Sequence, residues 1–475
     1  MTHLARPMVR AVIGLLAPLA LASCSMPRPP EKLDMDLPQQ YRESQPVQGT
    51  WNPARPADAS ERGAWWTVFG DPDLDNLIDE ARKANPNLAI ALARVKQARA
   101  AAGVVDADRA VQLDAGFGPT RQGGGRGADT STFTQWRAQL NFSYEVDLFG
   151  RLSDTSRAAR LDAEGQEAAY RSVLLALQAD VAQQYFAIRS LDSELDVLQK
   201  TVRLRQEALH LTQRRYDAGD TSELDVAQAR TELANTQAEQ EGVQRSRSLR
   251  DHALAVLLGK APAEFTLPAA PLQAPAISVP AGLPSELLQR RPDIAQAQRQ
   301  MAAGSARIGA AKAAFFPSLV LTGTGGLASD ELHNLFRWSS RSWLLGPLFG
   351  TALNVPLLDG GRNRANLAFA NAGYEALVSS YRQQVLVGFQ DVEDSLSSLR
   401  TLDQQIQFEN EAVRSANLAT RLAESRYRNG SASYLEVIDA ERSSLNAERA
   451  QTQILGQRAT ASVGLIRALG GGWDI

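Results

Sequence analysis

The chain of 475 residues is poor in the residue types on which most enzyme sites depend. It contains one cysteine and four widely separated histidines, which gives neither a thiol–imidazole pair nor the close spacing of zinc ligands. Aromatic residues make up 6% of the chain, and the net charge of −3 provides no basic footprint for nucleic acid. The composition therefore indicates a protein that is not an enzyme, has no metal or bound cofactor, and has no nucleic-acid partner.

Glycine-rich segments that could cradle a phosphate also lack their usual context. Residues 323–328 (GTGGLA) match a dinucleotide fingerprint loosely, but no helix is expected to follow them, so we predict an extracellular hairpin loop. Residues 123–125 are three glycines without the Gly-Lys-Ser ending of a phosphate-binding loop. Neither segment predicts nucleotide binding.

A long hydrophobic run is missing after residue 24, where no stretch approaches the roughly 18 apolar residues of a spanning helix. If the mature chain crosses a membrane, it must do so with β-strands closed into a barrel. The only comparable run, residues 11–21, is short and follows Arg6 and Arg10, which is typical of a signal peptide at 1–23.

The single cysteine ends the sequence Leu-Ala-Ser-Cys at residues 21–24, which resembles a bacterial lipobox. We therefore predict that Cys24 carries a diacylglycerol and an N-acyl chain. Ser25 follows the cysteine, and by resemblance to lipoprotein sorting this favours the outer membrane. The alternative is an ordinary signal peptide followed by a chance cysteine, which would leave an exported thiol unpaired.

The rest of the chain is a duplication. We predict a lipidated tether at residues 24–63, a first repeat at 64–259 and a second repeat at 284–470. A Pro- and Ala-rich linker at 260–283 separates the repeats, and a tail at 471–475 follows the second. Many identities recur at an offset of 211, such as Tyr216 with Tyr427 and Gly219 with Gly430; upstream the offset is 206. Each repeat is predicted to contain a helix, two strands, a very long helix, a tight turn and a returning helix.

The very long helix of the first repeat is predicted from Arg151 to Asp217. Its apolar residues recur every seven positions, at Leu174, Val181, Ile188, Leu195, Val202 and Leu209, which favours supercoiling against neighbouring helices. At 1.5 Å per residue such a helix spans roughly 100 Å, longer than a compact domain. Glycine-containing turns at 218–222 and 429–433 lead into returning helices at 222–258 and 433–469.

The expected strands alternate in polarity. From Trp136 to Val146, apolar residues alternate with polar ones, as in a strand with one side facing lipid. Its partner is expected at 111–120, and the second repeat has candidates at 318–326 and 343–355. A soluble amphipathic hairpin is the alternative. Four strands per chain are too few for a bacterial barrel, so three copies with 12 strands in total are predicted.

Four segments then resemble one family, the TolC-like outer membrane factors, in their lipidated NodT/OprM-type branch. The segments are 65–74 (WWTVFGDPDL), 144–151 (YEVDLFGR), 290–294 (RRPDI) with 314–317 (AFFP), and 356–362 (PLLDGGR). The first strand departs from the family pattern at residues 111–113 (VQL), where an aromatic–Pro pair is common.

The resemblance implies a mainly α fold with a membrane β-barrel part: a trimeric 12-stranded outer-membrane barrel continued by a 12-helix periplasmic α-barrel. It implies the passive exit duct of a tripartite efflux pump for drugs, metabolites or metals. The partners would be two further copies, outer-membrane lipid, a periplasmic adaptor (membrane fusion protein) and an inner-membrane RND-type transporter. A coiled-coil lipoprotein without a pore and a duct for protein secretion are the alternatives.

The resemblance also places candidate functional residues at the helix tips. Tyr427 and Asp439 correspond to constriction residues, and three carboxylates converging at a pore mouth would bind cations. Their structural alternatives are a packing tyrosine and a solvated helix acid. The predicted adaptor contacts are Gly219, Asp220, Thr221, Gly430, Ser431 and Ala432, although the same residues would also cap helices.

Overall fold

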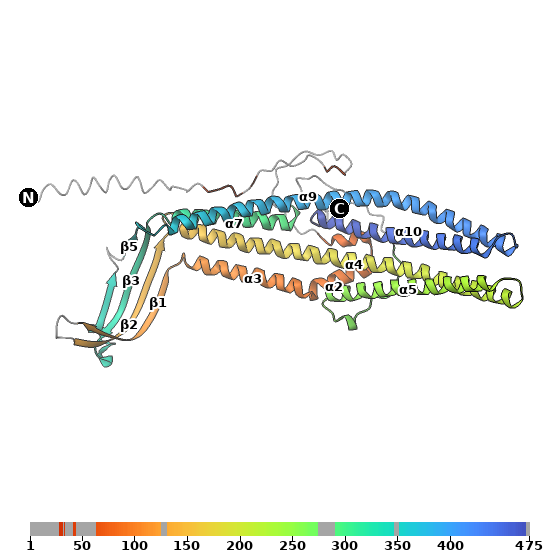
Figure 1. Cartoon of the computed structure of the whole chain (residues 1–475). Coiled ribbons are helices and arrows are strands. Elements are labelled where there is room, and N and C mark those ends of the chain that lie inside the picture. Colours follow the sequence, from red (N-terminus) through yellow and green to blue (C-terminus); the bar gives the residue numbers. More distant parts are fainter. Residues whose placement is uncertain are drawn as a thin grey trace, which may run out of the picture. The chain divides into compact units, whose positions relative to one another are not determined.

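The long helices of the computed structural model recur in pairs of equal length (Figure 1). The structure describes residues 28–31, 33, 41–43, 63–124, 131–273, 290–345 and 351–471. The paired helices are α3 (Pro86–Ala107) and α7 (Pro292–Ala313), α4 (Arg151–Asp217) and α9 (Arg362–Arg428), and α5 (Glu223–Leu257) and α10 (Tyr434–Ala468). Their ends shift by 206 residues for the first pair and by 211 for the other two, so the helices follow the offsets of the sequence.

The remaining helical elements are shorter. They are η1 (Trp65–Phe69), α2 (Pro72–Ala84), η2 (Pro262–Glu264), η3 (Leu332–Asn334) and η4 (Trp338–Ser340). The prediction of a helix from Arg151 to Asp217 is confirmed, and Ser222 and Ser433 are the N-caps of the returning helices. The predicted limits of the repeats, the tether and the linker stay predictions. Residues 1–27, with the predicted signal peptide and Cys24, lie outside the described residues.

The chain divides into two compact units, and both contain parts of each repeat. The first unit comprises residues up to 34, 94–167 and 296–382, and it holds every strand of the described chain. The second comprises 35–93, 168–295 and 383–475, and it holds α2, α5 and α10. Helices α4 and α9 run through both units. None of the helices in the described segments combines the length and low charge that a bilayer span requires.

One antiparallel sheet joins the strands of both repeats. Strand β1 (Gln112–Gly124) pairs with β2 (Ser131–Val146), and β2 pairs with β3 (Ser318–Ser329). Strand β3 then pairs with β4 (Arg341–Leu345) near one end and with β5 (Thr351–Asn354) near the other. The predicted strand at 343–355 is therefore observed in two pieces, with residues 346–350 outside the described chain. The sheet is four strand positions wide.

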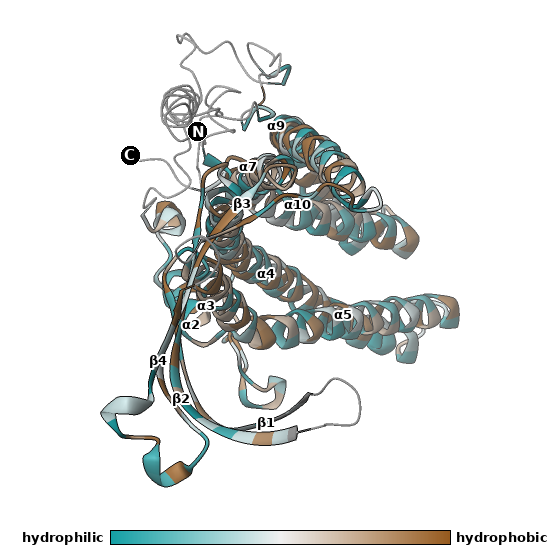
Figure 2. Cartoon of the chain, turned by 90° about the vertical axis from the view of Figure 1, so that its left-hand side faces the viewer, coloured by the Kyte–Doolittle hydropathy of each residue, from teal (hydrophilic) through white to brown (hydrophobic). Residues whose placement is uncertain are grey.

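The register places most apolar residues of this sheet on one face and most polar residues on the other. Figure 2 shows hydrophilic and hydrophobic segments succeeding one another along β1. A row across the apolar face runs Leu113, Phe142, Gly323, Leu345, and the next runs Ala115, Leu140, Gly325, Trp343. The intervening row runs Asp114, Asn141, Thr324, Leu344, so it is polar except on β4. The side chains of Asn141 and Thr324 hydrogen-bond at 3.1 Å. Trp343 is 76% exposed and Leu113 is 64% exposed, so the apolar face is uncovered within the chain.

The prediction of a hairpin loop at residues 323–328 is wrong. These residues lie inside β3 and pair with Phe142 to Arg137 of β2. Glycine is present at 326 because the backbones approach closely there: a Cβ at this position would overlap the Ala138 carbonyl group and lie 2.6 Å from the Cα of Gln139. The sequence pattern predicted a loop because glycine is common in loops, whereas Gly326 allows close packing of two strands.

The core of the second unit lies between α2 and the long helices. Trp65, Trp66, Leu74 and Ile78 pack with apolar residues of α4, α5 and α10, and the predicted heptad residues Val181 and Ile188 are fully buried among them. Asp71 caps α2 by accepting hydrogen bonds from the backbone N–H groups of Asp73 and Leu74, at 3.0 and 3.3 Å. The WW and FGDP motifs thus anchor α2 against the helical hairpins.

Replacing Gly326 by alanine tests the close approach of β2 and β3. Gly326→Ala should lower folded-state stability by about 1–3 kcal/mol, because the new methyl group meets backbone that cannot rotate away. The matched control is Gly325→Ala, whose methyl group would enter open space. Thermal unfolding by circular dichroism measures both; equal midpoints for the two variants would contradict the proposed role of Gly326.

Candidate functional site at the helical tips

Two turns end the long helical hairpins of the second unit, as Figure 1 shows. In the first, Gly219 adopts a φ of 79°, and the N–H groups of Gly219 and Asp220 donate to the carbonyl oxygens of Tyr216 and Arg215 at 2.9 and 2.8 Å. In the second, Gly430 has a φ of 71°, and the N–H of Ser431 donates to the carbonyl oxygen of Arg426 at 2.8 Å. Both are glycine-based helix ends that satisfy otherwise free carbonyl groups.

Each turn is closed by a capping box. Ser222 and Asp225 exchange side-chain and backbone hydrogen bonds, and so do Ser433 and Glu436. Of the six predicted contact residues, Gly219, Asp220, Gly430 and Ser431 are exposed, while Thr221 and Ala432 are half-buried. The turns are therefore closed by hydrogen bonds and largely exposed, which suits contact with another protein. Their role as adaptor contacts stays a prediction.

Tyr427 lies in an aromatic cluster beside the second turn. Its ring centroid is 5.5 Å from that of Tyr434, and the guanidinium carbon of Arg215 lies 5.0 Å from its ring centre. The cluster also includes buried Val437 and Ile438. Burial and the nearby Glu441 raise the pKa of Tyr434 to about 12, so this phenol is neutral at physiological pH. Tyr427 thus connects α9 and α10 to α4, in addition to its predicted place at the constriction.

Asp439 is placed differently. Its side chain is 65% exposed and lies 3.8 Å from Arg442, one turn further along α10. At that distance and exposure the attraction is weak. The carboxylate is therefore available to solvent, which its predicted role at a pore mouth requires. The constriction role of Asp439 stays a prediction.

An ionic connection between the two hairpins was not predicted. Glu232 of α5 has a side chain only 7% exposed, and its carboxylate lies 3.1 Å from Arg205 Nη1 of α4 and accepts from Arg442 Nε of α10 at 3.1 Å. Arg205 also donates to the carbonyl oxygen of Glu232 at 2.8 Å and to Thr236. Glu232 thus joins the first hairpin to the second.

The repeat offset contained a signal for this connection. The positions equivalent to Glu232, Arg442 and Arg205 are occupied by the uncharged residues Ser443, Thr231 and Ala416. Charges that break the internal symmetry mark a place where the two hairpins differ. Glu441 lies nearby, and burial raises its pKa, with Glu424 and Glu232 adding to the shift and Arg205 opposing it.

Two further contacts bring α4 and α10 together. Arg449 lies 2.9 Å from both Glu194 of α4 and Glu239 of α5, and Gln453 donates to Glu194 at 3.1 Å. At Gly456 a Cβ would come into overlap with Ser190, so α10 depends on glycine to approach α4. The glycine allows close helix packing, while Glu194 ties the hairpins by charge.

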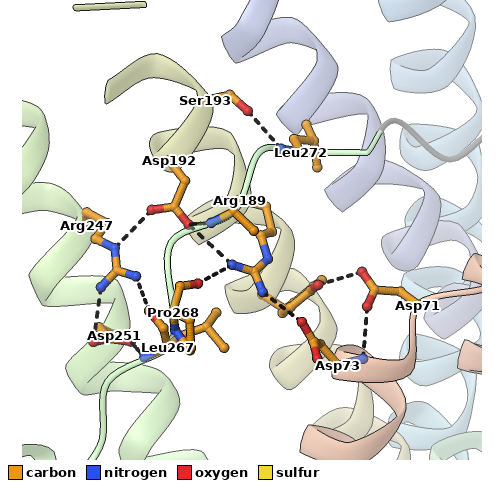
Figure 3. A network of polar contacts seen from close by, with 12 residues as sticks. Asp71, Asp73, Arg189, Asp192, Ser193, Arg247, Asp251, Leu267, Pro268 and Leu272 are labelled. Atoms are coloured by element: carbon orange, nitrogen blue, oxygen red, sulfur yellow. Dashed lines mark hydrogen bonds and ion pairs between the residues drawn. The ribbon is translucent and has the colours of Figure 1, made fainter. Parts of the chain in front are cut away.

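A buried charge network holds the chain after α5 against the first hairpin (Figure 3). Arg247 Nε lies 3.0 Å from Asp192, and Arg189 Nη1 donates to the carbonyl oxygen of Pro268 at 2.6 Å. In return, Asp251 accepts from the N–H of Leu267 at 3.0 Å. All four charged side chains are less than 10% exposed and paired, as buried ions must be. The network is structural, because every group is engaged within the chain.

An open pocket of about 860 Å³ lies among α4, α5, α9 and α10 of the second unit. Carbon atoms form the larger part of its exposed lining. The polar lining residues include Gln183, Gln184, Ser190, Ser398, Gln453, Gln457 and Thr460, together with Glu194, Asp394 and Arg250. The described residues contain no group of three or more potential metal ligands. This lining can hydrogen-bond to water and polar solutes.

Comparison with known proteins identifies this architecture. The model of the outer membrane efflux protein family matches residues 77–260 and again 283–471. The chain belongs to the outer membrane efflux protein family. It is 34% identical over 459 residues to the cation efflux system protein CusC of Escherichia coli O6:H1, covering 96% of this chain and 97% of CusC. It is 35% identical over 475 residues to the outer membrane protein OprJ of Pseudomonas aeruginosa, covering 98% and 96%.

Solved structures agree with the sequence relatives. The outer-membrane channel OprN superposes with a TM-score of 0.82 at 30% identity, covering 91% of this chain and all of that chain. The predicted family and the TolC-like fold are thereby confirmed. The protein is an outer-membrane channel subunit of an efflux system, and its family consists of channels.

Replacing Glu232 tests the connection between the hairpins. Glu232→Ala should lower stability by about 3 kcal/mol, because buried Arg205 would lose its counter-ion. Glu239→Ala is the control, since Glu239 is 45% exposed and its ion pair should contribute about 1 kcal/mol or less. Thermal unfolding in detergent measures both variants; a Glu232→Ala midpoint no lower than that of the control would refute the connection.

The raised pKa of Glu441 gives a pH-dependent prediction. The folded state binds the proton of the Glu441 carboxyl group more tightly than the unfolded chain does. Ionisation of Glu441 above about pH 4.3 therefore lowers the free energy of unfolding. Glu441→Gln removes that cost and should raise the thermal midpoint at pH 7, with the gain vanishing at pH 4. Thermal unfolding at both pH values provides the measurement. A gain that is the same at both values would exclude titration of Glu441 as its cause.

Proposed function

We propose that three copies of the chain close into one duct, with 12 strands in an outer-membrane barrel and 12 long helices in a periplasmic tunnel. The observation that carries the proposal is the open sheet. Within the described residues, the outer edges of β1 and of β4 and β5 have no strand partner. Unpaired backbone groups are costly in lipid, and a sheet four strands wide is below the eight of the smallest bacterial barrels.

The faces of the sheet support the same arrangement. Exposed Leu113, Leu140 and Trp343 share the apolar face, which would contact lipid. Asn141 and Thr324 share the opposite face, which would line the lumen. Further support comes from the family, whose solved members are described as channels.

The duct would receive its cargo from an inner-membrane RND-type transporter through a periplasmic adaptor and would itself carry out no catalysis. Adaptor contact is proposed at the tip turns, because these turns are closed by hydrogen bonds and largely exposed. The proposed contact residues are Gly219, Asp220, Thr221, Gly430, Ser431 and Ala432. Tyr427 and Asp439 are proposed as constriction residues. Cys24 is proposed to carry the diacylglycerol and N-acyl chains, in keeping with the relative named outer membrane lipoprotein SilC.

The proposed cargo is a small molecule, whose identity is set by the transporter. Relatives carry names as different as cation efflux protein CusC and toluene efflux protein TtgF. A pore-free scaffold and a duct for protein secretion remain the competing functions.

Planar-bilayer recording of the purified protein tests the duct and its constriction together. The wild type should be trimeric by native mass spectrometry and show stepwise conductance. Asp439→Ala should increase that conductance, because it removes the carboxylates that converge at the proposed constriction. Asp196→Ala is the control at an exposed acid of α4 and should leave the conductance unchanged. A monodisperse monomer without conductance would refute the duct. Identical conductance of Asp439→Ala and wild type would remove Asp439 from the constriction.

A further inference from the structure

Two arginines lie on the apolar face of the sheet, where the described strands carry no other charged side chain. Arg121 of β1 lies opposite Thr134 of β2. Arg341 of β4 lies opposite Leu327 of β3. Residues directly opposite in an antiparallel pair point to the same face, and alternate residues of one strand share a face. The register therefore places both arginines on the face of Trp343, and all three side chains are exposed.

Both arginines lie at the end of the sheet that is remote from the connected helices. At the other end, α3 leads into β1 and α4 follows β2, and α7 and α9 adjoin β3 and β5 there as well. Arg121 lies three residues before the end of β1, and Arg341 is the first residue of β4 after the connection at 330–340. Because the proposed duct has its helices in the periplasm, this end of the sheet would face the cell exterior.

The apolar face has the height of an outer-membrane span. On β2 the residues of this face are uncharged from Trp136 to Val146, over ten residue steps. Ten steps of about 3.3 Å reach about 33 Å along the strand, and a tilt of about 40° reduces this to about 25 Å along the membrane normal. Bacterial barrels have an apolar band of that height. Arg121 lies one row beyond Trp136 and therefore at the rim of the band, where lipid headgroups begin.

Aromatic side chains lie beside the arginines at this rim. The guanidinium carbon of Arg341 is 3.4 Å from the ring centre of Trp338, and Arg341 Nε donates to the Trp338 carbonyl oxygen at 2.7 Å. Trp338 and Trp343 are each 76% exposed. On β1 and β2, the ring centroids of Phe117 and Trp136 are 6.2 Å apart. Aromatic side chains of this kind mark the interface between hydrocarbon and lipid headgroups.

The two positive charges lack an acidic partner in the part of the chain that the structure describes. The acids closest in sequence to Arg341 are Asp330 and Glu331 in the connection before β4, and Glu331 accepts from the side chain of Asn334 at 2.6 Å. A guanidinium group binds phosphate through two parallel hydrogen bonds. At the rim of a lipid-facing surface, the phosphate of a lipid headgroup is the anion within reach.

We propose that each seam between copies of the duct binds the phosphate groups of an acylated, diphosphorylated outer-leaflet lipid, through Arg341 of one copy and Arg121 of the next. The inference rests on the proposed duct, because β1 and β4 lie at opposite edges of the sheet within one chain. Closure of the ring would place these edges side by side, with strands about 4.8 Å apart. Acyl chains of the bound lipid would cover exposed Trp343 and Leu345, which a soluble anion would leave uncovered.

Native mass spectrometry of the full-length trimer with diphosphoryl lipid A tests the site. The wild type should retain one lipid per seam. The double variant Arg121→Gln with Arg341→Gln should bind lipid A at least about tenfold more weakly, because charge-assisted contacts to phosphate are lost. Each single variant should weaken binding at least about threefold, because each seam needs both arginines. Arg137→Gln is the matched control and should bind as the wild type does, since Arg137 lies at a similar level but on the polar face, opposite Gly118.

A comparison of lipids keeps the test decisive if the double variant folds poorly. The wild type should bind monophosphoryl lipid A, which has one phosphate group fewer, at least about fivefold more weakly than diphosphoryl lipid A. Equal binding of the two lipids, equal affinity of wild type and double variant, or displacement of the lipid by an equal concentration of inorganic phosphate would overturn the site.

The same samples report separately on the duct. A conducting trimer that binds lipid A independently of Arg121 and Arg341 would refute the lipid site and leave the duct intact. A monomer without conductance would refute the duct itself.

Discussion

The pairing of β2 with β3 is the constraint on which the described architecture depends. It connects the first repeat with the second, from Trp136 opposite Ser329 to Val146 opposite Leu319. Because the side-chain period of a strand is two, this single register decides the face on which every residue of the sheet lies. It also sets the number of strand positions that one chain contributes. A repeat that folded alone would supply a two-stranded hairpin, which is marginal in water and unsuited to lipid.

The long helices also depend on neighbours, which they contact through side chains. Long helices with a seven-residue apolar period need neighbours, and α4 finds one in α10 through Ser190 opposite Gly456 and Glu194 with Arg449. Buried charges then specify which hairpins lie next to each other. Glu232 faces Arg205 within its own hairpin and Arg442 in the next, so two nearly equivalent hairpins are connected in one specific way. Paired charges of this kind add specificity more surely than they add stability.

The sequence predicted the helices well and the contacts between them poorly, for physical reasons. Helix ends follow local signals such as Gly219, Ser222 and Gly430, which act within a few residues and can be read directly. The strand pairing at Gly326 depends on a partner that is distant in sequence, and its glycine was therefore mistaken for a loop signal. Glu232 and Arg442 look like ordinary solvated charges until the fold brings them together. The predicted constriction role of Tyr427 and Asp439 comes from family resemblance, because a constriction forms only where the same residues of several chains meet.

The equal lengths of α4 and α9, 67 residues each, restrict how such a protein can change. Removing one heptad from α4 alone would shorten that arm by about 10 Å and leave the two tips of a chain uneven. A matching deletion in α9, and in both returning helices, would be required to restore level ends. The length of the helical arms should therefore change in evolution only through matching insertions or deletions in both halves of the gene. Natural relatives should then differ in arm length by the same number of residues in each half.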